Sequence, residues 1–199
     1  MKYLALALLA LSAAPLPAAR IFQVKVNTPT LVGDPGYVDF QFNSGGADAD
    51  AGSATITLFS GATPGTDFPI GDVTGSLPGT VTINNTPGLN DLFQAVTFGS
   101  EILFRVTIDG PVLNSFDPLS TSGSTFTFSM FADDQVTPLL TNDPAGFALT
   151  IDVGPLGALT VNDLSQRGVI ELAEVPEPST AALLLTGAAL IAARLRRRR

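Results

Sequence analysis

Few side chains in this sequence could carry out acid–base or nucleophilic chemistry. The chain has 199 residues and contains no Cys, no His and no Trp, which excludes a Cys nucleophile, a Ser-His-Asp triad and imidazole metal ligands. A serine nucleophile still needs a base, and Lys25 is the single lysine between residues 20 and 174. Because Lys25 falls in a predicted strand over residues 21–26, we interpret it as a charge at a sheet edge rather than as a Ser-Lys base.

Carboxylates are the other candidates for catalysis, because two of them suffice for glycoside hydrolysis. The glutamates of residues 20–174 are Glu101, Glu171 and Glu174, and nothing in the sequence places a pair of them at a working separation. Neither Asp-Thr-Gly nor Asp-Ser-Gly occurs, so an aspartic-protease dyad has no support. We therefore expect a protein that is not an enzyme, with a carboxylate-based glycoside hydrolase as the most distant alternative.

One short string has part of the pattern of a calcium loop. Asp48 and Asp50 alternate with alanines and precede Gly52, and calcium prefers oxygen ligands. The string lacks the third ligand and the distal glutamate of an EF-hand. Asp133-Asp134 is a second acidic pair, at a predicted strand end. We interpret Asp48 and Asp50 as part of a polar turn, with a weak Ca²⁺ site as the alternative and no other metal or cofactor expected.

The charge and the aromatic content bear on possible partners. Residues 20–174 hold 17 of the 18 acidic residues but only four of the 10 basic ones. Because a surface with this excess of acidic residues repels phosphate backbones, we do not expect nucleic acid as a partner. The chain has 13 Phe and two Tyr, and its Phe residues fall at alternate positions of apolar runs. This placement indicates a core, which counts against a polysaccharide-binding module without excluding one.

Residues 20–174 alternate between apolar and polar side chains with a period of two. Such alternation is typical of antiparallel strands with one buried face, and Gly, Pro, Asn and Asp clusters between the runs predict turns. We therefore predict an all-β fold, an antiparallel, jelly-roll-like β-sandwich of about eight to ten short strands. The predicted strands include residues 21–26, 38–42, 54–59, 81–83, 93–98, 102–108, 126–131, 147–153 and 169–172, and the predicted turns include residues 43–52, 61–65, 77–79, 84–88, 109–111 and 142–146.

The N-terminus has the pattern of a secretory signal peptide. Lys2 precedes an uncharged apolar stretch over residues 4–14, which is too short for a stable membrane anchor. Small residues follow, and we expect signal peptidase to cut at Ala18 or Ala19 after the Sec translocon has engaged the chain.

A second apolar stretch lies over residues 180–193. These 14 residues are short for a hydrocarbon core of about 30 Å, but counting from Val175 gives 19 residues, and Arg194 can extend toward the headgroups. We therefore predict a single transmembrane helix. Arginine resists translocation, so we expect this helix to stop transfer in the inner membrane with its basic end in the cytoplasm. The arginines of that end are Arg194, Arg196, Arg197, Arg198 and Arg199.

The features from residue 175 onward closely resemble the PEP-CTERM sorting signal of Gram-negative bacteria that make exopolysaccharide. The motif segment consists of Val175, Pro176, Glu177, Pro178 and Ser179. The resemblance implies that exosortase, an integral-membrane cysteine protease, recognises Pro-Glu-Pro, removes the tail and leaves the protein at the cell surface or outside the cell. Independently, the two prolines keep the segment extended and free of helical hydrogen bonds, which suits a protease.

The middle of the chain also resembles, less specifically, an uncharacterised group of PEP-CTERM proteins of similar length. The resemblance implies a shared fold and sorting route but no chemistry. It rests on residues 37–43, 77–85, 92–100, 124–134 and 142–152.

The sequence therefore predicts three parts: a signal peptide over residues 1–19, an exported β-sandwich domain over residues 20–174 and a sorting signal over residues 175–199. For the domain we expect a structural or adhesive role in an extracellular matrix or biofilm of exopolysaccharide. A polysaccharide- or calcium-binding module is the alternative.

Overall fold

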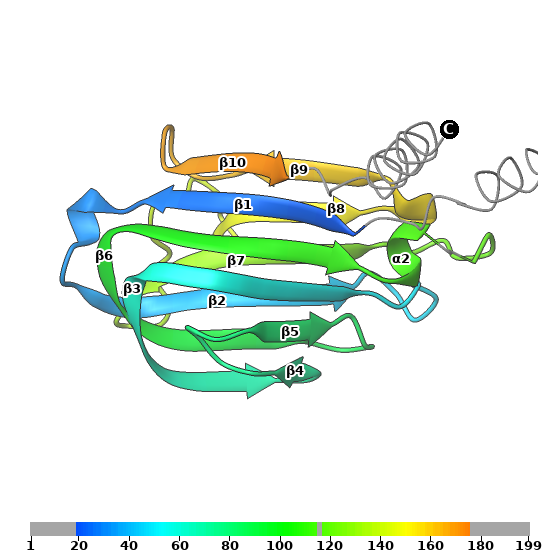
Figure 1. The fold of residues 1–199 in the computed structure, drawn as a ribbon, viewed down its shortest axis with the longest axis horizontal. Coiled ribbons are helices and arrows are strands. Elements are labelled where there is room, and N and C mark those ends of the chain that lie inside the picture. Colours follow the sequence, from blue (N-terminus) through cyan, green and yellow to red (C-terminus); the bar gives the residue numbers. More distant parts are fainter. Residues whose placement is uncertain (1–18, 115–116, 176–199) are drawn as a thin grey trace, which may run out of the picture. The chain divides into compact units, whose positions relative to one another are not determined.

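The computed structural model describes residues 19–114 and 117–175. Ala19–Val175 form one compact unit (Figure 1). The predicted signal peptide up to Ala18, the segment Pro176–Ser179, the transmembrane helix and the arginine tail lie outside the described residues. Among the residues that the structure describes, no helix is both long and apolar enough to cross a membrane.

The described chain is nearly all antiparallel β-sheet, as the alternation predicts. Every strand pairing within it is antiparallel. The strands are β1 (Arg20–Asn27), β2 (Pro35–Ser44), β3 (Ser53–Ile70), β4 (Val73–Thr74), β5 (Val81–Asn84), β6 (Asp91–Asp109), β7 (Ser124–Ala132), β8 (Phe147–Val153), β9 (Leu159–Asp163) and β10 (Ile170–Val175). Short helical turns occur at η1 (Pro29–Leu31), α2 (Pro111–Asn114) and η2 (Pro155–Gly157).

The long strand β6 organises the sheet, because its two halves pair with different neighbours. Residues 91–97 pair with β2, and residues 101–108 pair with β1. On its other side, β6 pairs with β3 over nearly its whole length. The order β10–β1–β6–β3–β5–β4, which we call the β1 row, can be followed from top to bottom in Figure 1. The order β3–β6–β2–β7–β8–β9 forms the β2 row.

The core lies between the two rows. The ring of Phe104, in the β1 row, meets the rings of Phe40 and Phe128, in the β2 row, at centroid distances of 5.1 and 5.0 Å. All three side chains are buried. Burial of apolar side chains such as these is the main favourable term in folding. Other fully buried members of the core are Val24, Val38, Phe42, Ile56, Ile83, Leu92, Ile102, Ile108, Phe126, Met130, Leu149 and Ile151.

Two glycines allow β3 and β6 to approach closely where they pass from one row to the other. Gly61 in β3 has a φ of +88°, a conformation that glycine adopts without strain. A Cβ on Gly99 of β6 would lie 1.9 Å from the carbonyl oxygen of Gly61. The β3–β6 register shifts on both sides of Gly61, and such irregularities are how long strands turn a corner between packed layers.

Most of the predicted strands and turns are confirmed, and the exceptions have a common cause. The predicted turn over residues 61–65 is wrong, because these residues continue β3, and the predicted strands 93–98 and 102–108 are one strand, β6. In both cases a long strand continues through the corner between the two rows, at a glycine that the sequence pattern marks as the end of a strand. The prediction that Lys25 marks a sheet edge is also wrong, because β1 pairs with both β6 and β10.

Candidate functional site

The two ends of the described unit are held together by strand pairing. β1 begins at Arg20, directly after the predicted signal-peptidase site at Ala19, and β10 ends at Val175, directly before Pro176. Ile21 lies opposite Val175 in the β1–β10 register. Arg20 Nε donates a hydrogen bond to Glu174 Oε1, which lowers the pKa of Glu174 and raises that of Arg20. Both predicted processing segments therefore adjoin the same end of one strand pair.

The other charged residue of β1, Lys25, is also ion-paired. Lys25 Nζ lies 3.5 Å from Glu171 Oε1 and 3.8 Å from Glu101 Oε2. A hydrogen bond from Asn27, followed by the charge of Lys25, lowers the pKa of Glu171. This arrangement brings Glu101 and Glu171 to a cation rather than to an open cleft.

The carboxylates of Asp48 and Asp50 contact the loop that precedes β7. Asp48 Oδ2 accepts hydrogen bonds from the backbone N–H and the hydroxyl of Thr121, each at 2.8 Å, and Asp50 Oδ1 accepts one from the Asp117 N–H at 2.9 Å. Hydrogen bonds from Ser122 and Thr121 lower the pKa of Asp48. These contacts fit the polar-turn interpretation. The described residues contain no group of three or more His, Cys, Asp or Glu side chains arranged to hold a metal ion.

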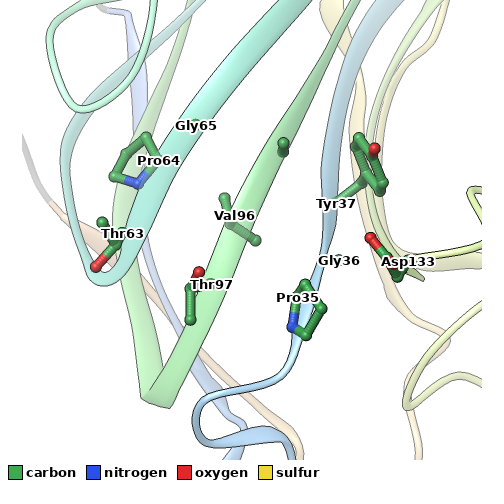
Figure 2. Close-up of a pocket in the computed structure, with 10 residues that line it drawn as sticks. Pro35, Gly36, Tyr37, Thr63, Pro64, Gly65, Val96, Thr97 and Asp133 are labelled. Carbon is green, nitrogen blue, oxygen red and sulfur yellow. The ribbon is translucent and has the colours of Figure 1, made fainter.

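A groove of about 240 Å³ lies across β3, β6 and β2, on the face turned away from the core. Figure 2 shows Tyr37 and Asp133 on one side, Thr63 and Pro64 on the other, and Thr97 between them. The Tyr37 ring stacks on Phe93 at 4.6 Å, and its hydroxyl accepts a hydrogen bond from Gln135. Tyr37 is the single tyrosine of residues 20–174, so the groove combines one aromatic wall with hydroxyl groups and a carboxylate.

A pair of carboxyl groups lies on the same outer face, next to the aromatic stack. Asp39 of β2 and Asp91 of β6 are 5% and 8% exposed, and their side chains are within hydrogen-bond distance of each other. Burial, the contact with Asp91 and the charge of Asp91 together raise the pKa of Asp39 to about 8. Gln41 Nε2 donates to Asp39 Oδ2 at 2.8 Å, so one oxygen of Asp39 has a fixed partner.

Alternation alone does not identify this acid pair. In the run Val38-Asp39-Phe40, the aspartate occupies a position that a two-residue period assigns to the wet face. The pair forms only because the β2–β6 register places Asp91 opposite Gln41, the residue two positions from Asp39. Because residues 38–42 alternate regularly, Asp39 occupies an ordinary polar position of the strand, and no local signal marks it.

The comparisons with known proteins bear on the C-terminal segment. The family model of the PEP-CTERM protein-sorting motif matches residues 174–199. The chain carries a PEP-CTERM sorting motif. No curated protein and no solved structure is significantly similar to the chain. The predicted resemblance of the C-terminus is therefore confirmed, and the motif implies an exported protein that exosortase processes.

The matched segment contains every residue of the predicted sorting signal. It begins at Glu174, the residue that pairs with Arg20, and includes Pro176, Glu177 and Pro178 together with the terminal arginines. The motif thus follows the last strand of the sheet without a linker. The individual roles of these residues, like the cut at Ala18 or Ala19, stay predictions.

Proposed function

We propose that residues 20–174 are a non-catalytic domain that is exported, anchored briefly in the inner membrane and then delivered by exosortase to the cell surface or the extracellular matrix. The observation that carries this proposal is the sorting motif at residues 174–199, which adjoins the last residue of β10. A structural or adhesive role is consistent with the ion-paired state of Lys25, Glu101 and Glu171. These are the groups that catalysis would otherwise need free.

The pairing of β1 with β10 supports this route in physical terms. The strands of the sheet lie between the two processing segments, so removal of both terminal segments would delete no strand pair. Of the possible architectures we assign a β-sandwich, because the ring of Phe104 packs edge-on against Phe40 and at a tilt against Phe128, both from the other row. A jelly-roll order of the strands is part of the same proposal.

Intact mass measurement of the product, in cells and in the medium, tests the sorting route. Glu177→Ala should leave export and signal-peptide removal intact and should block loss of the tail, so the cell-associated mass should increase by that of the C-terminal segment. The matched control is Glu171→Ala, which removes a glutamate of β10 outside the matched segment. Release of Glu177→Ala at the wild-type mass and rate would contradict exosortase processing.

A polysaccharide-binding module is the second candidate, and the groove beside Tyr37 favours it. The Tyr37 ring offers an apolar face, while Thr63, Thr97 and Asp133 offer hydrogen-bonding groups on the groove walls. Sugars present the same combination of C–H faces and hydroxyls. In a glycan array, Tyr37→Ala should lose binding that the wild-type chain shows, while Leu119→Ala, at an exposed position outside the groove, should keep it. An array without any bound glycan would remove this candidate.

A further inference from the structure

Four buried oxygens on the outer face of the β2 row lack hydrogen-bond partners among the described residues. They are Asp39 Oδ1, Asp91 Oδ1, Thr127 Oγ1 and Ser129 Oγ. The exposed fractions of these residues are 5%, 8%, 5% and 1%. Buried polar atoms in native proteins almost always have a partner, and an ion is one of the recognised explanations when the protein supplies none.

The strand register gathers these four oxygens on adjacent strands. Ser129 lies directly opposite Asp39, and Thr127 lies opposite Gln41, in the β2–β7 pair. Asp91 lies opposite Gln41 in the β2–β6 pair. Side chains that face each other across antiparallel strands have Cβ atoms about 5 Å apart. All four side chains share one face, because the intervening residues of β2 and β7, such as Phe40 and Phe128, point into the core.

Among the residues that the structure describes, no basic side chain forms an ion pair with Asp39 or Asp91. The four basic residues of the stretch 20–174 are Arg20, Lys25, Arg105 and Arg167. Arg20 and Lys25 lie on β1, Arg105 lies in the half of β6 that pairs with β1, and Arg167 precedes β10. Two carboxylates at hydrogen-bond distance repel each other strongly. The patch therefore needs either a proton or a cation between them.

We propose that Asp39, Asp91, Ser129 and Thr127 form a binding site for one Ca²⁺ ion. The two carboxylates supply the charge, Ser129 and Thr127 supply neutral oxygens directly or through water, and water completes the shell. The donor set consists entirely of oxygen, which calcium prefers, and calcium tolerates the irregular geometry of donors from three strands better than Mg²⁺ does. Gln41 orients Asp39 by its hydrogen bond to Oδ2. The ion would enter beside Asp91, whose cross-strand neighbour Ile70 is 50% exposed.

This site differs from the calcium string that the sequence suggests. The carboxylates of Asp48 and Asp50 already accept hydrogen bonds from the loop before β7, whereas Asp39 and Asp91 each keep an unpartnered oxygen. Asp48→Asn is therefore a control that removes a carboxylate of the same domain and leaves the proposed ligands unchanged.

Calorimetric titration of the full chain with CaCl₂, in detergent and after treatment with a chelator, tests the proposal. We expect one ion per wild-type chain, with an affinity of about 0.1–1 mM, as in extracellular calcium modules. Saturating Ca²⁺ should also raise the Tm by about 3–10 °C. Asp39→Asn and Asp91→Asn should each abolish both effects, and Asp48→Asn should retain them.

Three results would overturn the assignment. One is the absence of heat and of a Tm shift with the wild-type chain, which would leave a proton as the only occupant of the pair. A second is retention of both effects in Asp39→Asn and Asp91→Asn. The third is their loss in Asp48→Asn alone, which would move the ion to the loop. Asn has the shape of a protonated Asp, so each variant should fold. Far-UV circular dichroism and a cooperative melt of each variant check this, so that a loss of calcium binding is not mistaken for unfolding.

Discussion

The acid pair should make the domain less stable as the pH rises, and Asp39→Asn should weaken this dependence, leaving the part that comes from Asp91, whose pKa burial also raises. The pKa of Asp39 is about 8 in the folded chain, whereas an aspartate without neighbouring groups has a pKa of 3.8. The second value applies to the unfolded chain. Between these values the folded state binds a proton that the unfolded state has released. The free energy of unfolding therefore falls with rising pH, because stability decreases wherever the native state holds more protons.

The slope sets the magnitude of the effect. One proton corresponds to about 1.4 kcal/mol per pH unit, so the loss between about pH 5 and pH 8 is at most about 4 kcal/mol. Water entry and relaxation reduce the desolvation of a buried carboxylate. We therefore expect the free energy of unfolding to fall by about 2 kcal/mol over this pH range. The pKa values of Asp48, Asp134, Glu171 and Glu174 are lowered. The stabilisation that these carboxylates contribute is complete above about pH 4–5 and is lost only at lower pH. It therefore does not change between pH 5 and pH 8.

Urea unfolding of the full chain between pH 5 and pH 8, in a buffer with chelator and detergent, measures this dependence. Asp39→Asn can still donate a hydrogen bond to Asp91, so it should match the wild type at the acidic end and exceed it at the alkaline end. Asp48→Asn, the matched control, should show the wild-type slope. Parallel curves for the wild type and Asp39→Asn would refute the argument, because Asp39 would then titrate alike in both states.

Three further substitutions test the packing and the loops. Phe104→Ala should lower the free energy of unfolding by about 3–5 kcal/mol, as measured by urea titration, whereas Phe68→Ala, at a position 48% exposed, should cost less than about 1 kcal/mol. Gly99→Ala should destabilise the fold or shift the β3–β6 register, because its Cβ would overlap the Gly61 carbonyl, while Gly154→Ala, whose Cβ would lie 3.5 Å from its nearest neighbour, should be tolerated in a thermal melt. Asp48→Ala should speed hydrogen exchange at the Thr121 amide, its hydrogen-bond partner, with little change at β7.

The alternation of apolar residues predicts the strands where one face is buried and fails where tertiary contacts override it. Phe126–Phe131 reads as a strand because Phe126, Phe128 and Met130 all enter the core. The second half of β3 contains Gly61, Pro64 and Gly65, and their propensities indicate a turn. Pairing with β6 supplies the hydrogen bonds that keep this half extended. β9 is mostly exposed, so it has no apolar period to detect.

The candidate sites divide in the same way. The sorting motif is a contiguous string, and its residue types alone identify it at residues 174–199. The acid pair and the groove are built from segments far apart in the chain, so only the register brings Asp39 to Asp91, or Tyr37 to Thr97. The contacts of Asp48 and Asp50 are likewise not local, because their carboxylates accept hydrogen bonds from Thr121 and Asp117 in the distant loop before β7.

The direction of the strands leads to a last prediction about the anchored precursor. Val175 lies opposite Ile21, near the start of β1. β1 then runs to Asn27, and η1 connects that end to the start of β2 at Pro35. The groove at Pro35 and Thr97 therefore lies at the opposite end of the sheet from Val175. If residues 180–193 anchor the chain, the covalent link at Val175 keeps the Val175 end nearer to the bilayer.

The chain contains no Cys, so a single introduced Cys can carry a fluorophore without background labelling. Leu119, in the loop before β7, lies at the Val175 end, and Val136, after β7, lies at the groove end. These residues are 83% and 75% exposed and make a matched pair. With the full chain in vesicles that contain headgroup-nitroxide lipids, the label at Leu119→Cys should be quenched more strongly than that at Val136→Cys. Equal quenching, or the reverse order, would show that the membrane does not hold the domain by its β10 end, and the proposed path from anchored precursor to released protein would fail with it.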